Sequence, residues 1–540
     1  MKSQIRKYRR ILYFFLLPVI LVSVYFFIHL NIGSKPVIKS QKLDLFLPPP
    51  NRVPVNNKFI YKSAGELANL VKSRKATSVE IVQEFISNIK NNNYKYNAIV
   101  WLRENEALDE AKKADEAVAK GGDLPPLLGV PITVKEEFWV KGSPVTLNSK
   151  MNDKFIAPVD GPIVQQLKKA GAIILGKTNL PTLLLDFQVQ GEVYPVGSNP
   201  YDTTKTPGGS TGGGASALAA GFTSLEFGSD LGGSIRVPAS FCGLYGLKTT
   251  FGTINVTEGD GTEAVSTHKR FALNTAGPLA RTPEDLEVAW NVLKETRPDN
   301  RFQQPVIWKQ PSGRKISKYK IAWTDDWKTS SGTIKVGSDV KVKMSRLIDS
   351  VKKYGAGIKK YAPDTYEEMM NSYLTCLALI AGEGKSPEIR QMINKDMHIW
   401  DDDSGILNPF YTTMMNQNDS TWIQWQQQNN KLKRKWDSFF SHFDFFICPI
   451  TYGAAFNKCP KGSAITIEGI TVSYFRYFPY ATILNPIECP AITIPLGLND
   501  KGLPIAIQVI GPKFSEPELL HFAKLLKPLV PGFLKPDLLH

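Results

Sequence analysis

The sequence predicts an α/β fold, because strand-like and helix-like segments alternate along the chain. Residues 172–176 and 505–509 are short runs of mainly aliphatic residues, as in buried β-strands. Thr77 and Glu80 form a T-x-x-E capping box, and apolar residues then recur at helical spacing as far as Ile89. This pattern predicts a helix that begins at the capping box.

The composition is that of one large globular domain. Of the 540 residues, 42% are hydrophobic and 21% are charged, so the chain has enough apolar material to bury a substantial core. No internal repeat and no second domain boundary is visible in the sequence.

The net charge of +15 is partly concentrated at the N-terminus, where five basic residues lie within the first ten positions. The other basic residues are dispersed, without the basic stripe and interleaved aromatic residues that are typical of nucleic-acid binding. We therefore expect no nucleic-acid partner, and we attribute the N-terminal charge to attraction by an anionic bilayer surface.

Residues 11–30 carry no charged side chain and predict a transmembrane helix. Twenty residues at a helical rise of about 1.5 Å span roughly 30 Å, the thickness of a hydrocarbon core. A cleaved signal peptide is the alternative, but its apolar region is about 7 to 15 residues long and ends in a small-x-small site. Here the run ends in His29-Leu30-Asn31, which favours an uncleaved anchor.

The anchor divides the chain into a basic tail (1–10), a transmembrane segment (11–30), a proline-rich stem (31–58) and a globular domain (59–540). Five basic residues precede the apolar run and three closely follow it, which predicts a cytoplasmic N-terminus. The globular domain is then expected in the lumen of the endoplasmic reticulum or of another endomembrane.

A glycine- and serine-rich tract between Pro207 and Thr250 is the strongest functional signal. Large apolar residues are interleaved in it, which is untypical of a flexible linker and typical of a core. Within it, Gly232-Gly233-Ser234 places successive backbone N–H groups beside a hydroxyl, an arrangement that can hold an oxyanion.

Three segments of the chain resemble the signature of the amidase signature family, serine hydrolases that use Ser, Ser and Lys. They are 129–136 (GVPITVKE), 208–213 (GGSTGG) and 230–238 (DLGGSIRVP), and the serines of the last two stand 24 residues apart. Shorter matches follow as far as residue 497, so the resemblance runs from about residue 60 to the C-terminus. It implies a single domain with a mixed β-sheet covered by helices on both faces. The apolar N-terminus and the stretch 489–509 are most similar to membrane-attached fatty-acid amide hydrolases, the second type in particular.

The resemblance implies a role for each of three catalytic residues. Ser234 is the expected nucleophile, Lys135 the base and Ser210, after a cis Gly-Ser peptide bond, the hydroxyl that connects them. Burial among apolar neighbours lowers the pKa of a lysine, so that it can act as a base near neutral pH. The expected oxyanion donors are the N–H groups of Leu231, Gly232, Gly233 and the nucleophile itself.

Asp230 and Arg236 flank the expected nucleophile, and we predict a structural ion pair that supports its turn, since arginine cannot act as a base. No residue spacing indicates a metal site, and neither a metal nor a cofactor is expected. The five cysteines are expected to be buried free thiols, with a Cys448–Cys459 disulfide as the alternative.

The chain departs from the family pattern in several places. Thr211 stands where a second serine is common, Gly214 where lipid amidases often have Glu, and Thr249 where Pro is usual. Residues 401–428 occupy the position of a hydrophobic membrane cap but are largely polar. The aromatic and methionine residues of that segment, Phe410, Tyr411, Met414, Met415, Trp422 and Trp425, either line the mouth of a pocket or, as their near-helical spacing favours, belong to the core.

These features together predict a membrane-anchored serine hydrolase of fatty-acid amides, either primary amides or N-acylethanolamines. Its partners would be a lipid amide and the bilayer, and the sequence leaves a monomer or a homodimer open. The alternatives are an amidase of small or aromatic amides and the amidase subunit of a tRNA-linked amidotransferase. A non-catalytic membrane scaffold is a further alternative, against which the intact Ser-Ser-Lys set argues.

Overall fold

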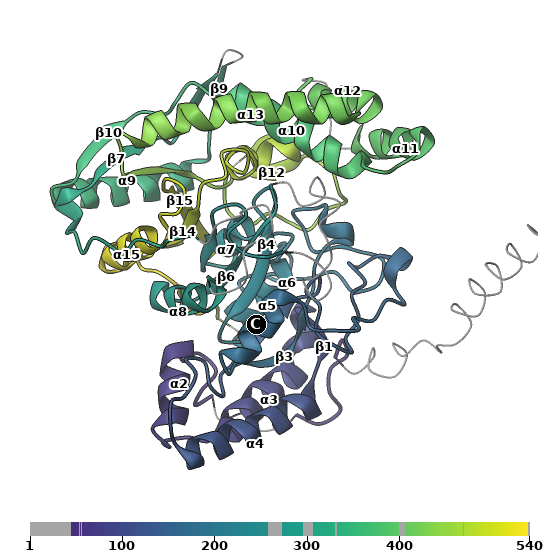
Figure 1. Ribbon diagram of the computed structural model, residues 1–540, viewed down its shortest axis with the longest axis vertical. Helices are drawn as coiled ribbons and strands as arrows, with labels where there is room; N and C mark the ends of the chain where they lie inside the picture. Colours follow the sequence, from purple (N-terminus) through teal and green to yellow (C-terminus); the bar gives the residue numbers. More distant parts are fainter. Residues whose placement is uncertain are drawn as a thin grey trace, which may run out of the picture. The chain divides into compact units, whose positions relative to one another are not determined.

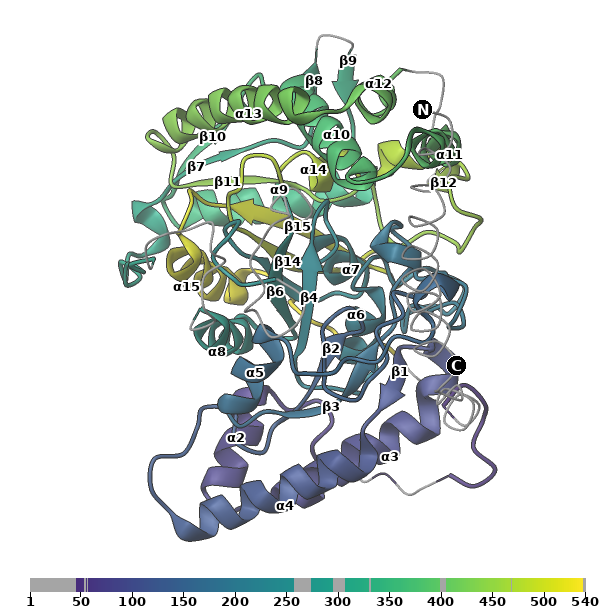
Figure 2. The same cartoon turned by 45° about the vertical axis from the view of Figure 1, so that its right-hand side comes forward.

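The structure of the protein is a computed structural model. In the part of the chain that it describes, one mixed β-sheet lies at the centre (Figures 1 and 2). The described residues are 45–52, 55, 57–256, 273–294, 306–329, 332–398, 405–467 and 469–537, and they belong to the compact unit Asp44–His540. The predicted basic tail and transmembrane segment lie outside them. Across the described ranges, no helix combines the length and the apolar character needed to cross a membrane.

The sheet has eleven strands in the order β1-β3-β2-β4-β6-β5-β14-β15-β11-β7-β10 among the described residues. Its strands are β1 (Ile99–Leu102), β2 (Pro131–Lys135), β3 (Ile173–Thr178), β4 (Glu226–Asp230), β5 (Tyr245–Lys248), β6 (Thr275–Ala280), β7 (Lys320–Trp323), β10 (Gly357–Lys360), β11 (Phe445–Pro449), β14 (Ala491–Leu498) and β15 (Pro504–Ile510). Two small hairpin sheets pair β8 (Trp327–Thr329) with β9 (Gly332–Ile334) and β12 (Ile465–Ile467) with β13 (Ile470–Val472).

Strand direction changes across the main sheet. Strands β3, β2 and β4 run parallel, as do β11, β7 and β10, whereas the strands between β4 and β11 pair antiparallel. The predicted mixed α/β sheet is therefore confirmed. Residues 172–176 and 505–509, predicted as strands, lie in or next to β3 and β15.

Helices cover both faces of this sheet. They are α2 (Ala64–Lys72), α3 (Ser78–Tyr96), α4 (Glu104–Lys120), α5 (Pro162–Lys169), α6 (Gly212–Ala219), α7 (Arg236–Phe241), α8 (Pro283–Leu293), α9 (Ser338–Lys353), α10 (Tyr366–Gly382), α11 (Pro387–Met397), α12 (Asn408–Asn416), α13 (Asp419–Phe440), α14 (Pro479–Thr482) and α15 (Glu516–Leu526). Helices α10 to α13 gather at one end of the sheet, and α2 to α4 gather at the other end, beside β1 and β3 (Figures 1 and 2).

The alternation of side chains along a strand shows why both faces need cover. Phe445 and Ile447 of β11 pack in the apolar cluster that includes α8, α9 and α15, whereas Phe446 and Cys448 pack in the cluster of α10, α12 and α13. Because successive strand residues point to opposite faces, a strand that is apolar throughout must be buried on both.

Helix α3 begins where its sequence predicts. Thr77 is the N-cap, its hydroxyl accepts a hydrogen bond from the Glu80 N–H, and the Glu80 carboxylate accepts one from the Thr77 N–H at 2.8 Å. This reciprocal pair satisfies two backbone donors that the first helical turn leaves unpaired.

The aromatic and methionine residues of 401–428 belong mainly to the core, as their spacing favours. Phe410, Met414 and Trp425 are buried against α10, while Met415 is 44% exposed. The five cysteines are free thiols, so the alternative Cys448–Cys459 disulfide is not formed.

Two neighbouring parallel strands bring the signature segments to one edge of the sheet. Strand β2 ends at Lys135 and strand β4 ends at Asp230, and the two strands pair in register through Thr133 opposite Glu226. Their carboxyl ends therefore point the same way, and the turn that follows β4 lies next to the end of β2.

The family resemblance predicts a glutamate at position 214, where this chain has glycine. The side chain of Glu226 occupies the space next to Gly214 instead. A Cβ atom built on Gly214 would overlap the Glu226 carboxyl. That carboxyl is fully buried and accepts hydrogen bonds from the hydroxyls of Thr133 and Thr178. Burial raises its pKa to about 8, although the two hydroxyls oppose the shift. The carboxyl group therefore comes from β4 instead of α6, and Gly214 leaves the room that it needs.

We expect Gly214→Ala to lower the free energy of unfolding by about 1–3 kcal/mol, because the new methyl group would overlap a hydrogen-bonded carboxyl that has no room to move. In a Glu226→Ala background the same substitution should be neutral or stabilising by up to about 1 kcal/mol, since alanine is the better helix former. Urea unfolding of the four variants measures this coupling. An equal effect of Gly214→Ala in both backgrounds would contradict the contact.

Candidate active site

Lys135 ends strand β2 with its side chain wholly buried at the edge of the sheet. Its amine donates hydrogen bonds to Ser210 Oγ at 2.8 Å and to Ser229 Oγ at 2.9 Å, and it forms an ion pair with Glu137 Oε1 at 3.0 Å. Burial lowers the pKa of Lys135, and the neighbouring Glu137 carboxylate opposes this shift. The structure thus brings the predicted base and the predicted connecting serine into direct contact.

Ser210 lies just before helix α6, after a cis Gly209–Ser210 peptide bond. The turn between β4 and α7, residues 231–235, carries Ser234, and we call it the nucleophile turn after the predicted role of that serine. The Thr211 N–H holds the segment of Ser210 against this turn, because it donates to the Ser234 carbonyl at 3.1 Å. Both Ser210 and Ser234 line the same pocket. The two signature serines, 24 residues apart in sequence, therefore face one cavity.

Ser234 lies in the turn between β4 and α7, and it is 9% exposed. Gly233, directly before it, has φ +117°, a backbone conformation that residues with a Cβ rarely adopt. The tight turn that presents Ser234 therefore depends on this glycine.

Asp230 and Arg236 form a fully buried ion pair beneath that turn, with Nη2 of Arg236 2.9 Å from Oδ1 of Asp230. The Asp230 carboxylate also accepts from the Ile235 N–H at 3.1 Å, and Arg236 donates to Gln508 at 2.8 Å and to Asn485 at 2.6 Å. Although burial opposes it, the Arg236 guanidinium holds the pKa of Asp230 well below its usual range. The pair ties the nucleophile turn to β15 and to the segment after α14.

Of the four N–H groups predicted as oxyanion donors, one already has an acceptor within the protein. The N–H of Gly233 donates to Asp230 Oδ1 at 2.8 Å, so it supports the turn instead of facing a ligand. Within the described ranges, the N–H groups of Leu231, Gly232 and Ser234 meet no acceptor, and all three residues line the pocket. These three groups are the ones available to an oxyanion.

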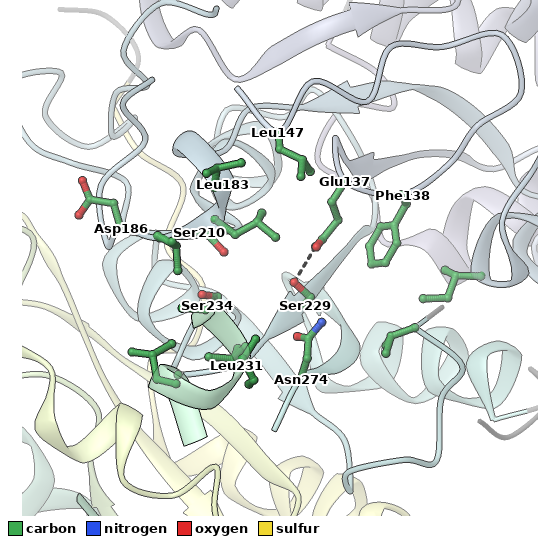
Figure 3. A pocket seen from close by; sticks show the side chains of 18 of the residues that line it. Glu137, Phe138, Leu147, Leu183, Asp186, Ser210, Ser229, Leu231, Ser234 and Asn274 are labelled. Carbon is green, nitrogen blue, oxygen red and sulfur yellow. Dashed lines mark hydrogen bonds between the residues drawn. The ribbon is translucent and has the colours of Figure 1, made fainter. Parts of the chain in front are cut away.

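The pocket has a volume of about 310 Å³ and a mainly apolar wall (Figure 3). Its apolar side chains come from several separate segments of the chain and include Phe138, Trp139, Leu147, Leu183, Leu184, Leu185, Leu231, Leu377, Ile380 and Phe475. The described lining residues include two carboxylates, Glu137 and Asp186, and no lysine or arginine. Such a cavity suits an apolar acyl group.

Several lining residues were not predicted from the sequence. Glu137 and Ser229 adjoin signature residues and could have been examined, because each lies one or two positions from a predicted residue in the same strand or turn. Asp186, whose carboxyl accepts a hydrogen bond from the Tyr474 hydroxyl, and Tyr373, whose hydroxyl lies against Gly232, come from segments without a recognisable motif. Only the fold brings them to the site.

Comparisons with known proteins agree with this geometry. A family model described as Amidase matches residues 80–520. A subunit of the glutamyl-tRNA(Gln) amidotransferase of Sulfurihydrogenibium sp. (strain YO3AOP1) is 28% identical over 480 residues, which cover 86% of this chain and 96% of that protein. Among solved structures, a fatty acid amide hydrolase superposes with a TM-score of 0.73 at 20% identity, covering 89% of this chain and 87% of that chain. A bacterial aryl acylamidase superposes with a TM-score of 0.73 at 21% identity, covering 88% and 98%.

The two structural likenesses show the fold, and the family match extends over most of the compact unit. It includes the three segments that carry Lys135, Ser210 and Ser234. The chain therefore belongs to the amidase family.

Proposed function

We propose that this amidase hydrolyses amides of apolar acyl groups, fatty-acid amides among them, through an acyl-enzyme on Ser234. The observation that carries the proposal is the apolar cavity that Ser234 and Ser210 both line. Each buried CH₂ group of an acyl chain contributes about 0.8 kcal/mol. The absence of lysine and arginine among the described lining residues argues against a carboxylate-bearing acyl group.

The proposed reaction passes protons between Lys135, Ser210 and Ser234, the two serines of which line one pocket. Neutral Lys135 accepts the proton of Ser210 across their 2.8 Å contact while Ser210 accepts the proton of Ser234, whose oxygen attacks the amide carbonyl. The N–H groups of Leu231, Gly232 and Ser234 receive the developing oxyanion. The reverse transfer through Ser210 protonates the leaving amine, and water then hydrolyses the ester on Ser234.

Membrane attachment is the second part of the proposal, and it rests on the sequence of residues 11–30. A membrane-bound enzyme meets a long-chain amide where that amide accumulates, in the bilayer. The charge asymmetry around the apolar run favours a lumenal catalytic domain.

A second candidate function is that of an amidotransferase subunit. The 28% identity to a glutamyl-tRNA(Gln) amidotransferase subunit, over 96% of that protein, supports it. Such a protein would release ammonia from glutamine for a partner, so its pocket would need to hold an ammonium and a carboxylate. Asp186 and Glu137 are suited to an ammonium, whereas the described lining residues offer no cation for the carboxylate. This is why we place hydrolysis of apolar amides first.

Ser234→Ala should abolish labelling by a fluorophosphonate probe and reduce kcat by about 10³-fold or more, because the attacking oxygen is lost. The substitution removes a single hydroxyl, so the melting temperature should change little. Ser345→Ala, at an exposed position of α9, is the matched control and should label fully. Full turnover by Ser234→Ala would disprove the acyl-enzyme.

The ratio kcat/KM should rise with acyl-chain length. Four added carbons contribute about 3 kcal/mol if each CH₂ is buried, which is about a hundredfold in affinity. The measurement compares a series of primary fatty-acid amides with an anilide and with glutamine. Best turnover on the anilide would indicate an aryl amidase, and ammonia release from glutamine alone would favour the amidotransferase function.

For the full-length chain in sealed microsomes, we expect the catalytic domain to be protected from added protease until detergent opens the membrane. The physical reason is the excess of basic residues before the apolar run, which retains the N-terminus in the cytoplasm. Immunoblotting against an epitope in the domain reads the result. Digestion without detergent would reverse the assigned topology, and recovery of the protein in the carbonate-soluble fraction would refute the anchor.

A further inference from the structure

We propose that Glu137, linked to Lys135 directly and through Ser229, is a positioning residue that holds the resting lysine as an ammonium and takes its proton to the pocket. The inference rests on the proposed function, in which Lys135 acts only as the neutral amine. Glu137 itself takes no part in the attack on the amide.

The three contacts of Lys135 match an ammonium group. An ammonium has three N–H donors, and Lys135 has three acceptors within 3.0 Å: Ser210 Oγ, Ser229 Oγ and Glu137 Oε1. A neutral amine has two donors and one lone pair. The observed arrangement therefore stabilises the charged lysine, and one proton must leave before Lys135 can accept a proton from Ser210.

Glu137 connects the buried amine to the cavity. Lys135 is wholly buried and does not line the pocket, whereas Glu137 lines it and its side chain is 12% exposed. Ser229 donates to Glu137 Oε1 at 2.6 Å and also lines the pocket, and Figure 3 shows the Glu137 carboxyl directed at the Ser229 hydroxyl. The link from amine to cavity thus passes through one carboxylate and one hydroxyl.

The proton transfer balances without another reactant. The proton leaves Nζ of Lys135, whose N–H bonding pair becomes the amine lone pair, and a Glu137 oxygen gains it to form a neutral carboxyl group. That carboxyl group releases the proton to water in the pocket and regains its charge. The lysine is left neutral, with its lone pair available to Ser210.

Other charged groups around the site have partners of their own, although the charge of Lys177 also interacts with Glu136 and Glu137. Glu226 is held by two threonine hydroxyls, and burial raises its pKa to about 8. Asp230 is paired with Arg236, and the nearby buried Lys177 donates to the Pro144 carbonyl at 2.5 Å. In the described part of the chain, Glu137 is the carboxylate that pairs with Lys135. Burial lowers the pKa of Lys135 and Glu137 is the largest opposing influence, ahead of Asp230 and Glu226.

The test is the pH dependence of kcat/KM for a fatty-acid amide, with wild type, Glu137→Gln, Glu137→Asp and Ser229→Ala. The rate of the wild type rises with pH as Lys135 loses its proton. Glu137→Gln removes the charge that favours the ammonium. The rising limb of the pH profile of kcat/KM should therefore shift by about 1–3 pH units toward acid in this variant. Glu137→Asp retains a carboxylate and should keep a rising limb close to that of the wild type. Ser229→Ala removes one of the three acceptors of Lys135 and should shift the limb toward acid by less than Glu137→Gln does.

The rate of fluorophosphonate labelling of Ser234 against pH is a second readout, which does not depend on substrate binding. It should show the same shift in Glu137→Gln. A limb that does not move, with a rate that falls equally at every pH, would show a structural role alone and overturn the inference. An unmoved limb with a higher KM for amine-bearing amides would assign Glu137 to substrate binding, which also overturns it. Full turnover by Lys135→Ala is a different outcome, because it would defeat the proposed function itself.

Discussion

The burial of one lysine amine at the edge of the sheet is the interaction on which the rest of the site depends. An ammonium without acceptors in a dry interior would cost several kcal/mol or more, so such a group is stable only where acceptors replace its water. Ser210, Ser229 and Glu137 supply those acceptors around Lys135. The three come from the segment before α6, from β4 and from the turn after β2, so the arrangement requires that these segments meet.

The turn that carries Ser234 also contains buried charged groups, and these too need partners inside the protein. The Asp230 oxygens accept from the N–H groups of Gly233 and Ile235 and from Arg236, which in turn donates to Gln508 and Asn485. Because the pair is buried, removal of one partner would leave an uncompensated charge. In the described part of the chain, the N–H groups of Leu231, Gly232 and Ser234, which line the pocket, meet no acceptor.

Position 214 is a place where this chain departs from the pattern that the family resemblance predicts. The resemblance predicts a glutamate on the helix that follows Ser210, but here the carboxyl reaches the same space from β4. In its ionised form Glu226 would raise the pKa of Lys135, but its influence comes after those of Glu137 and Asp230. Most of the apolar wall of the pocket comes from loops, α5 and α10, which lie outside the three signature segments.

The sequence by itself determined the class of fold, the helix at Thr77, the strands at 172–176 and 505–509 and the segments that carry Lys135, Ser210 and Ser234. These follow from local rules, namely capping, periodicity and the glycine-dependent turn, and from a motif with fixed spacing. The tertiary structure alone decided that Gly233 donates to Asp230, that Glu226 fills the space above Gly214 and that Glu137 pairs with Lys135. It also brought Tyr373 and Asp186 to the pocket from segments more than 180 residues apart. Hydrogen bonds and steric contacts depend on distances between atoms from remote parts of the chain, and those distances exist only once the sheet and its helices have packed.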